Sequence, residues 1–482
     1  MSLYGGVELI GRPDLENIQK LDLLPMRSVE EMTRYGMAID IPHLEALTEV
    51  LTKEIEELRY EICSYIPPAK LDEFIEKSNM DAEDDYLPMN VESTKQMRKL
   101  LFDVLGVGKG HQLKMTKSGD ISTGKRQMEA RKNDHPVVQP VLDYRERSKL
   151  KGTYSAKLPL IARLHPHKDC WCGLPHFAPT YRVHCDVMMT RTSTGRPATK
   201  NPNLQNIPVR SEHGRSVRKS FIASPGTEMV TVDFSQLELR LLAHFGHVKK
   251  LIQIFHEDKD PHNYTAMEAF QQPDESKIDK ITQRAPAKNV NFAIVYGETP
   301  KGLFEQLVSD TYGKSGIPVP DWLTLAWCEE FMRKWFRIYP EVKHYMKKEF
   351  YHARRYGVVW TGFGRTRKVP EVKSVHKRVI AAGERQSGNH KIQGTGADML
   401  KLAQVEIQDF IEKEIRPEGI WCWPLNEVHD ELIYEIEEGY GWILLAKCEE
   451  VMKNVLVDKE TGENLCRVPI KASGAIMQRW AK

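Results

Sequence analysis

The sequence has no apolar run long enough to cross a bilayer and no cysteine pattern typical of a disulfide scaffold. No uncharged apolar run approaches the ~20 residues that a membrane-spanning helix needs. Its eight cysteines are scattered without a C-x-x-C pair, which is typical of reduced intracellular thiols. The start, MSLYGGVELIGRPD, lacks the basic and apolar segments of a secretory signal. We therefore expect a protein of the cytoplasm, in a bacterial host or associated with its nucleoid, that does not contact membranes; an organelle is the alternative.

The chain also has little net charge. It carries 69 Lys and Arg residues against 67 Asp and Glu residues, a formal net charge of +2. A surface for nucleic acid would therefore have to arise from local segregation of charge. Charged residues make up 28% and apolar residues 41% of the 482 positions, which is globular composition and excludes a disordered or collagen-like chain. At roughly 150 residues per domain, this length predicts about three domains.

One local segregation of charge lies between Gly106 and Lys132. This stretch mixes glycines and hydroxyl residues with basic side chains and has almost no large apolar residue, so we expect a flexible basic loop. Such a loop is either a solvated surface or a contact for nucleic-acid phosphates. The candidates for phosphate contact are Lys109, Lys114, Lys117, Lys125 and Arg126.

Two aspartates are predicted at the ends of strands. The run 229–232 alternates as a strand does, and helical spacing begins at Leu237, which leaves Asp233 at the strand end. Two further strand-like runs are separated only by His429 and Asp430, the spacing of a tight hairpin. Carboxylates fixed at two strand ends can converge and hold a pair of divalent cations, and their hard oxygens suit Mg²⁺. The alternative is two aspartates that cap elements or form salt bridges.

A third pattern places two cations and two rings at four-residue steps. Arg284, Lys288, Phe292 and Tyr296 would form one slowly drifting stripe on a helix. Such a stripe could bind a triphosphate through its cations and stack its rings on a sugar and base. Because proline fits only the first turn of a helix, Pro286 indicates that the helix begins later than Arg284.

These three patterns together resemble the motifs of family A DNA polymerases, the group that includes bacterial DNA polymerase I. The first motif is similar to VDFSQLELR, the second to RAPAKNVNFAIVYG and the third to EVHDELIYEI, in the family's order. Further similarity lies in TGRPATKNPNLQNIPVR, DPHNYTAMEAF, GRTRKVPE and ERQSGNHKIQGTGADMLK. The resemblance extends from about residue 23 to residue 482. Because it resembles the polymerase part alone, a phage-type enzyme is our expectation.

The resemblance implies an α+β fold shaped as a right hand, with an antiparallel-sheet palm, helical fingers and a helical thumb. We expect a short lead at residues 1–22 and a thumb at 23–150 with a basic tip near 106–132. A first palm part would follow at 151–246, the fingers at 247–410 and a second palm part at 411–482. It implies template-directed DNA synthesis in replication or repair, with deoxynucleotides added to a primer 3′-hydroxyl. The implied partners are primer–template DNA and deoxynucleoside triphosphates, and we expect a monomer.

The resemblance also assigns the chemistry of catalysis. Asp233 and Asp430 would hold two Mg²⁺ ions, for which Mn²⁺ can substitute, and the carbonyl of Phe234 would add an oxygen. Lys288 and Arg284 would neutralise the departing phosphates. Glu431 would assist near the metals, with structural support of the strand as the alternative.

For the incoming nucleotide, the resemblance gives Glu238 the role of excluding a ribose 2′-hydroxyl. Phe292, where other members carry Tyr, resembles the members that reject sugars lacking the 3′-hydroxyl. Tyr296 would lie near the templating base. Gln236 and His262 complete the expected nucleotide site.

For DNA, polar side chains would reach minor-groove acceptors, which every correct base pair presents in similar positions. The candidates are Arg196, Arg385, Asn389 and Gln393, of which the last three are spaced by four and share one helix face. His429 would contact the primer end. Template or primer would also be held by Asn203, Gln205 and Asn206, and by Lys114 and Lys117 of the basic loop.

Three alternatives stay open. A cluster of His165, His167, Cys170, Cys172 and His176 could bind zinc, although its C-x-C spacing is not that of a usual zinc knuckle. Because only about 22 residues precede the thumb, we expect no nuclease activity in this chain, and an exonuclease or replication protein could act in trans. The rival functions are an RNA polymerase or reverse transcriptase on the same palm, and a silent DNA-binding scaffold.

Overall fold

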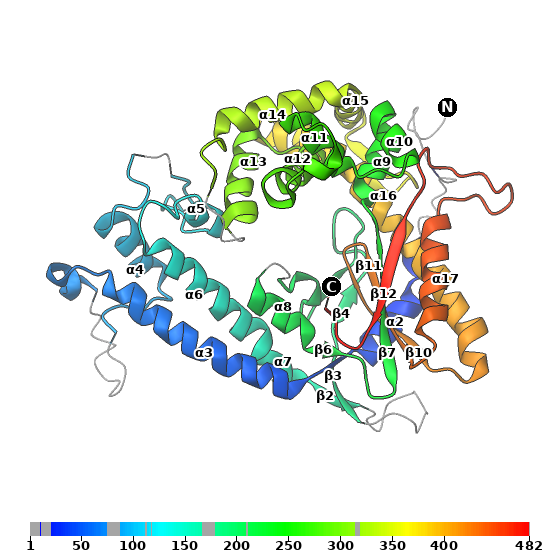
Figure 1. Cartoon of the computed structure of the whole chain (residues 1–482), viewed down its shortest axis with the longest axis horizontal. Coiled ribbons are helices and arrows are strands. Elements are labelled where there is room, and N and C mark those ends of the chain that lie inside the picture. The colour runs from blue at the N-terminus through cyan, green and yellow to red at the C-terminus, as the bar shows by residue number, and fades with distance from the viewer. Residues whose placement is uncertain are drawn as a thin grey trace.

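The computed structural model describes residue 10 and residues 21–74, 87–110, 113–116, 118–165, 179–208, 211–313 and 319–481. Two four-stranded antiparallel sheets lie at its centre, and helices extend from them on two sides (Figure 1). The larger sheet has the strand order β10-β11-β7-β12. Its strands are β7 (Thr227–Phe234), β10 (Cys422–Val428), β11 (Glu431–Glu437) and β12 (Ala472–Met477).

Strand β7 lies inside this sheet and pairs with β11 on one side and β12 on the other. It is buried along most of its length because helices cover the sheet, and even Thr227 and Thr231 of its sequence TEMVTVDF are buried. Helix α17 (Gly441–Asn454) packs on β7 and β12, and α2 (Met26–Tyr35) packs on β10. The predicted strand, the predicted hairpin and the switch to helix α9 (Leu237–Gly246) are confirmed.

The second sheet has the order β2-β3-β1-β6, and two small hairpins complete the strands. Its strands are β1 (Met37–Ile39), β2 (Arg163–His165), β3 (Thr180–Val183) and β6 (Phe221–Ile222). The hairpins are β4 (Asp186–Met188) with β5 (Ala198–Lys200), and β8 (Val358–Trp360) with β9 (Thr366–Lys368).

A fully buried ion pair joins the two sheets. Arg182 of β3 contacts Glu435 of β11 at 2.5 Å, and neither side chain has exposed surface. The same guanidinium donates to the carbonyls of Tyr35 and Gly36 and lies over the Tyr35 ring at 3.8 Å. Glu435 also accepts hydrogen bonds from Ser224 and Thr227. Both charges are therefore fully solvated by protein groups, which buried ions require.

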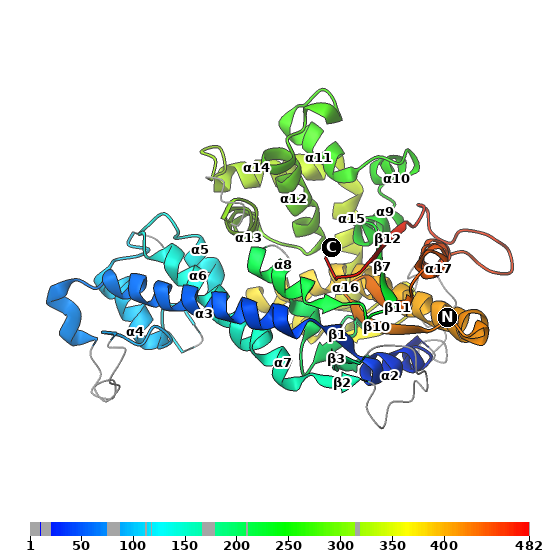
Figure 2. The same ribbon diagram turned by 60° about the horizontal axis from the view of Figure 1, so that its bottom comes forward.

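A helical arm extends away from the sheets and has its own hydrophobic core (Figures 1 and 2). Its long helices α3 (Ile41–Ser64) and α6 (Val138–Leu150) pack side by side. Asp40 caps α3 by accepting from the backbone N–H of His43, so α3 begins directly after β1. The arm also contains η1 (Pro68–Glu73), α4 (Thr94–Arg98), η3 (Lys99–Val104), α5 (Lys125–Glu129), η4 (Lys151–Ser155) and α7 (Lys157–Ile161).

The expectation of an unstructured basic loop at 106–132 is wrong in part. Met115 and Ile121 form an antiparallel bridge, and α5 follows within the same stretch. The side chain of Gln127 accepts from the N–H of Lys114 at 2.7 Å and donates to the carbonyl of Ser122 at 2.7 Å. Local polar contacts therefore give this stretch structure that its lack of apolar residues did not predict.

A second group of helices lies at the top of the view, beyond the end of β7 (Figures 1 and 2). It packs through a core continuous with the sheet. Its members are α9, α10 (Lys249–His256), α11 (Pro261–Phe270), η6 (Glu275–Lys277), η7 (Lys280–Arg284), α12 (Ala285–Val295), α13 (Pro300–Gln306), η8 (Leu307–Gly313), α14 (Leu325–Ile338) and α15 (Pro340–Tyr356).

One long helix, α16 (Lys377–Phe410), connects this group to the sheet. It packs against α9 and α15 and also against α17 and α2. The short elements η9 (Pro370–Lys373), η10 (Ile411–Ile415) and η11 (Arg416–Glu418) flank it, while η5 (Leu204–Asn206) and α8 (Glu212–Lys219) precede β6. Polar residues of α16 therefore have neighbours from distant parts of the chain.

Two features of the described residues concern disulfides and membrane-spanning helices. The six cysteines within the described ranges, at 63, 185, 328, 422, 448 and 466, are buried and form no disulfide. Among the helices of the described residues, none has the length and apolar character that crossing a membrane requires.

Candidate functional site

Sheet pairing brings the two predicted aspartates together. Glu431 of β11 stands opposite Asp233 of β7, so Asp430 lies one residue beyond that pair. The carbonyl of Asp430 accepts a hydrogen bond from the N–H of Phe234 at 3.3 Å. Both adjoining turns contain a non-glycine residue with positive φ, Gln236 at 54° and His429 at 60°. Such backbone is uncommon outside glycine and often occurs at functional sites.

A cavity of about 530 Å³ lies over these strand ends. Asp233 and Asp430 both line it, so the two predicted aspartates lie on one cavity. Most of the candidate residues from the sheet and its turns also line this cavity. The lining includes Arg196, Gln205, Arg218, Asp233, Phe234, Gln236, Glu238, Phe292, Tyr296, His429, Asp430 and Glu431.

Arg196 connects two acidic groups of the cavity. Its Nη2 lies 3.0 Å from Oδ1 of Asp430 and 3.1 Å from Oε1 of Glu238. Burial alone would lower the pKa of Arg196, but the carboxylates of Asp430 and Glu238 raise it above its ordinary value. The guanidinium is therefore charged, and it neutralises part of the acidic cavity in this conformation.

Tyr296 closes the same side of the cavity. Its hydroxyl donates to Glu238, with distances of 2.8 and 2.9 Å to the two carboxylate oxygens. Burial raises the pKa of Glu238, and the charge of Arg196 opposes that rise. Burial and the neighbouring Glu238 also raise the pKa of Tyr296, which keeps its hydroxyl protonated as a donor. Glu238 is thus an internal acceptor here rather than an exposed helix-surface residue.

Glu431 forms an ion pair that sequence reasoning missed. Nη2 of Arg218, on α8, lies 2.8 Å from Oε2 of Glu431, and the guanidinium lies over the ring of Trp480 at 3.8 Å. Burial lowers the pKa of Arg218. No local motif marks Arg218 because its partner is 213 residues away. The contact agrees with a supporting role for Glu431 and leaves its role in catalysis a prediction.

Asp260 was also missed, although it lies within a quoted motif. Its carboxylate contacts Arg284 at 2.5 Å and accepts from the amide of Gln236 at 3.3 Å. It also caps α11 by accepting from the N–H of His262 at 2.7 Å. Asp260 therefore holds three of the predicted nucleotide-binding residues. The signal available was an aspartate directly before Pro261 at a helix start.

The predicted stripe is built from two kinds of helix. The α-helix begins at Ala285, as Pro286 indicated, while Arg284 ends the preceding π-helix η7. Lys288 is exposed, and its Nζ lies 6.0 Å from the centre of the Phe292 ring. His262 packs against the same ring with centroids 5.6 Å apart. Burial lowers the pKa of His262 to about 4, so this imidazole is neutral at pH 7.

The three polar residues expected on one helix face all lie on α16. Arg385 packs its stem against Gly297, where an added Cβ would lie 2.6 Å from Cγ of Arg385. Gln393 hydrogen-bonds to Tyr296. The side-chain oxygen of Asn389 is buried without a hydrogen-bond partner among the described residues. A buried unsatisfied acceptor is costly, so an external donor is expected there.

The residues expected to hold template or primer near η5 lie beside the cavity. Asn203 accepts from the N–H of Gln205 at 3.1 Å and so caps η5. The amide of Gln205 donates to the carbonyls of Pro197 and Glu427 at 3.3 and 3.2 Å. Asn206 is exposed. Contacts of these three residues with DNA stay predictions.

Of the remaining candidates, Lys114 and His165 do not line the cavity, and the others lie outside the described residues. Lys114 is exposed near the end of the helical arm, and Lys117 lies outside the described residues. Of the histidine and cysteine cluster, only His165 is described; it is buried, with its ring 5.0 Å from that of Tyr35. His167, Cys170, Cys172 and His176 lie outside the described residues. Within the part of the chain that the structure describes, no group of three or more His, Cys, Asp or Glu side chains could hold a metal ion.

Comparisons with known proteins identify the family. The sequence model of DNA polymerase family A matches residues 68–482. The chain belongs to DNA polymerase family A. It is 35% identical over 431 residues to "DNA polymerase I, thermostable" of Thermus filiformis. This match covers 89% of this chain and 44% of that protein. It is also 35% identical over 367 residues to DNA polymerase I of Deinococcus radiodurans, covering 76% of this chain and 34% of that protein.

A solved family A structure has the same fold. The POL domain of Pol1 from M. smegmatis, in complex with DNA primer–template and dNTP, matches with a TM-score of 0.77 and 27% identity. The match covers 97% of this chain and 72% of that one. The expected α+β class and right-hand architecture are therefore confirmed. The chain spans less than half the length of the curated polymerases it matches.

Proposed function

We propose that this chain is a DNA-directed DNA polymerase that adds deoxynucleotides to a primer 3′-hydroxyl as a template directs. The observation that carries the proposal is the convergence of Asp233 and Asp430 in one cavity, at the ends of paired strands. Membership of family A and the primer–template and dNTP bound to the M. smegmatis domain support it. We keep the expected division into thumb, palm and fingers as part of this proposal.

The donor set fits two Mg²⁺ ions, with Mn²⁺ as a substitute. The carboxylates of Asp233 and Asp430 and the backbone carbonyl of Phe234 would supply hard oxygens, which Mg²⁺ prefers. The bound ions would activate the 3′-hydroxyl and stabilise negative charge on the leaving oxygen. Asp430 would exchange its contact with Arg196 for the metal, which releases that guanidinium toward the primer terminus.

The helical fingers would bind the triphosphate. Lys288 is exposed and would contact its phosphates, and Arg284 would exchange the carboxylate of Asp260 for phosphate oxygens. Phe292 would face the sugar. Tyr296 would leave Glu238 when the nucleotide enters, because both residues line the cavity that the nucleotide would fill. Glu238 would then stand against the 2′ position of the sugar.

Arg196, His429 and the face of α16 would hold the duplex. The arginine and the amides would donate to minor-groove acceptors and so test pairing without reading sequence. The basic tip would contact phosphates through Lys114 and Lys117. A role in replication or repair, the monomeric state and an exonuclease partner in trans belong to the same proposal.

Primer extension with purified protein tests the proposal. On a DNA template with dNTPs and Mg²⁺ we expect extension, and Asp430→Asn abolishes it while primer–template binding stays near the wild-type level. Normal extension by Asp430→Asn would refute the metal assignment. Parallel reactions with ribonucleotides and with an RNA template test the two rival polymerase activities. A labelled primer with a mismatched 3′ end tests the expected lack of proofreading, because shortening would reveal a nuclease.

A further inference from the structure

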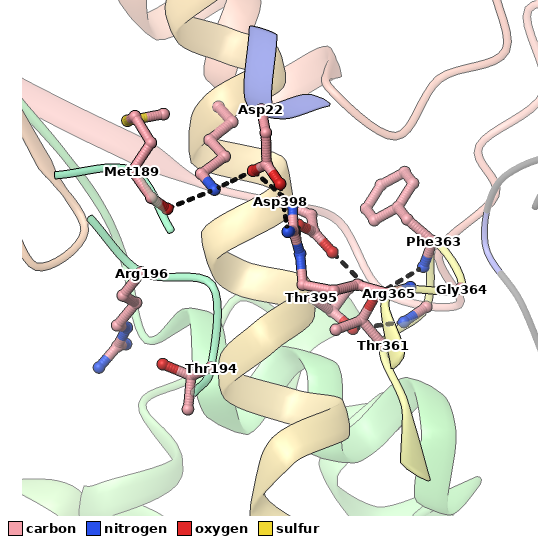
Figure 3. Close-up of polar contacts among 12 residues, drawn as sticks. Asp22, Met189, Thr194, Arg196, Thr361, Phe363, Gly364, Arg365, Thr395 and Asp398 are labelled. Atoms are coloured by element: carbon pink, nitrogen blue, oxygen red, sulfur yellow. Dashed lines mark hydrogen bonds and ion pairs between the residues drawn. The ribbon is translucent and has the colours of Figure 1, made fainter. Parts of the chain in front are cut away.

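Outside the cavity, four charged side chains form a buried cluster beside α16 (Figure 3). Asp398 and Lys401 come from α16, Arg365 from the turn before β9, and Asp22 from the segment before α2. Arg365 contacts Asp22 through two nitrogens, at 2.7 and 3.0 Å, and its Nε contacts Asp398 at 2.8 Å. Lys401 donates to Asp22 at 2.6 Å. Arg365 lies in the motif GRTRKVPE, and Asp398 and Lys401 lie in ERQSGNHKIQGTGADMLK, but the resemblance assigns none of these three residues a role.

The cluster is balanced only while Asp22 is present. Lys401 and Asp398 have no exposed side-chain surface, and Arg365 is 13% exposed. Two positive and two negative charges therefore neutralise each other in a cluster that is open to water only at Asp22 and Arg365. Asp22 contacts both cations, so its loss would leave one buried positive charge uncompensated.

The rest of the cluster is fixed by neutral partners. Thr361 donates to Asp398 at 2.8 Å and accepts from the N–H of Arg365 at 3.1 Å. Thr395 of α16 accepts from the N–H of Gly362 at 2.7 Å. The hairpin turn is therefore tied to α16 at several points, and the guanidinium of Arg365 has a defined direction.

The segment that carries Arg196 rests on this cluster. Gly195 has a φ of 82°, and an added Cβ would lie 2.9 Å from both Cδ and Nε of Arg365, so the turn lies directly against that side chain. At the other end of the segment, Lys401 donates to the carbonyl of Met189 at 3.4 Å. Thr192 donates to the carbonyl of Arg196 at 2.6 Å, which closes the turn between them. Figure 3 shows Arg196 on this segment, to the left of α16, with its guanidinium directed away from the cluster.

We propose that Asp22 is a positioning residue for Arg196. By fixing Arg365 and Lys401, it holds both ends of the segment 189–196 and so sets the place of the Arg196 guanidinium in the cavity. A residue 174 positions before Arg196 thereby acts on the primer terminus without touching it. This inference rests on the proposed function, because it assigns Arg196 to the primer–template minor groove.

The test measures primer extension by Asp22→Asn, which keeps the shape of the side chain and removes its charge. We expect kcat on a matched primer terminus to fall about tenfold with little change in KM for dNTP, because a displaced positioning group costs rate rather than nucleotide binding. The preference for matched over mismatched termini should fall as well. Asp22→Glu, which keeps both ion pairs, should recover most of the loss.

The double variant with Arg196→Ala separates positioning from stability. If Asp22 acts through Arg196, Asp22→Asn has no further effect on the matched-to-mismatched ratio once Arg196 is absent. Independent losses in the double variant would overturn the inference. Asp409→Asn is the matched control, since Asp409 also joins α16 to the α2 region through an ion pair with Arg27, but at the exposed end of the helix. It should leave the ratio unchanged.

Two outcomes distinguish this inference from the proposed function. Wild-type protein that does not extend primers refutes the function, whereas wild-type extension with an unchanged ratio in Asp22→Asn refutes only the role of Asp22. If Asp22→Asn does not fold, Arg365→Lys makes the same test, because it keeps the charge but loses the forked contacts with Asp22 and Asp398. A wild-type ratio in Arg365→Lys would then overturn the inference.

Discussion

The choice between deoxyribose and ribose can be tested at Glu238. Its side chain is 8% exposed, and it is held between the Tyr296 hydroxyl and the Arg196 guanidinium. When Tyr296 leaves, the buried side chain of Glu238 would keep its carboxylate in place beside the sugar. A 2′-hydroxyl would then enter space that is already filled. We expect Glu238→Ala to open this space and to raise ribonucleotide incorporation.

The magnitude follows from the cost of overpacking. Forcing extra atoms into a filled site costs about 1–3 kcal/mol. At roughly 1.4 kcal/mol per factor of ten, this cost gives a discrimination of about 5- to 150-fold. Glu238→Ala should remove that share of the discrimination. Glu238→Gln keeps the volume and loses the charge, so it should retain most of the discrimination if volume is the cause.

The assay is single-nucleotide incorporation on one primer–template. It measures kcat/KM for a dNTP and for the matching ribonucleotide with wild type, Glu238→Ala and Glu238→Gln. Tyr296→Phe is the control for the lost hydrogen bond, because it removes one donor to the Glu238 carboxylate and leaves the Glu238 side chain in place. An unchanged ratio in Glu238→Ala would remove Glu238 from sugar selection, and equal ratios in the two Glu238 variants would show that charge rather than volume decides.

Two further predictions concern binding and stability. Arg284→Gln should raise KM for dNTP roughly tenfold or more, since a hydrogen bond to a charged group contributes about 1.5–3 kcal/mol; an unchanged KM in steady-state extension would contradict the phosphate contact. Arg182→Met should lower the free energy of unfolding by about 3–5 kcal/mol in urea titrations, because it leaves Glu435 buried and unpaired. Burial alone would raise the pKa of Glu435, but Arg182 and its hydrogen bonds hold it below the ordinary value of 4.5. Its stabilisation is therefore complete above that pH and is lost as the pH falls toward the folded pKa, a dependence that Glu435→Gln should remove.

The local sequence determined the elements that carry the site. Alternation followed by helical spacing predicted β7 and α9, and two strand-like runs two residues apart predicted the hairpin with Asp430 at its turn. The four-residue steps predicted a shared face on α16. These signals are readable because each depends on neighbours within a few positions, where backbone periodicity dictates which side chains share a face.

The contacts that join these elements were decided by the tertiary structure. Arg196 lies 234 residues from Asp430, Arg218 lies 213 from Glu431, and Asp22 lies 343 from Arg365. Pairs so far apart leave no periodic signal, since any arginine and any carboxylate look alike until the chain is folded. Family resemblance supplied the expected chemistry of the cavity. Which charges neutralise one another, and which segment they hold in place, follows only from how the sheets and α16 pack.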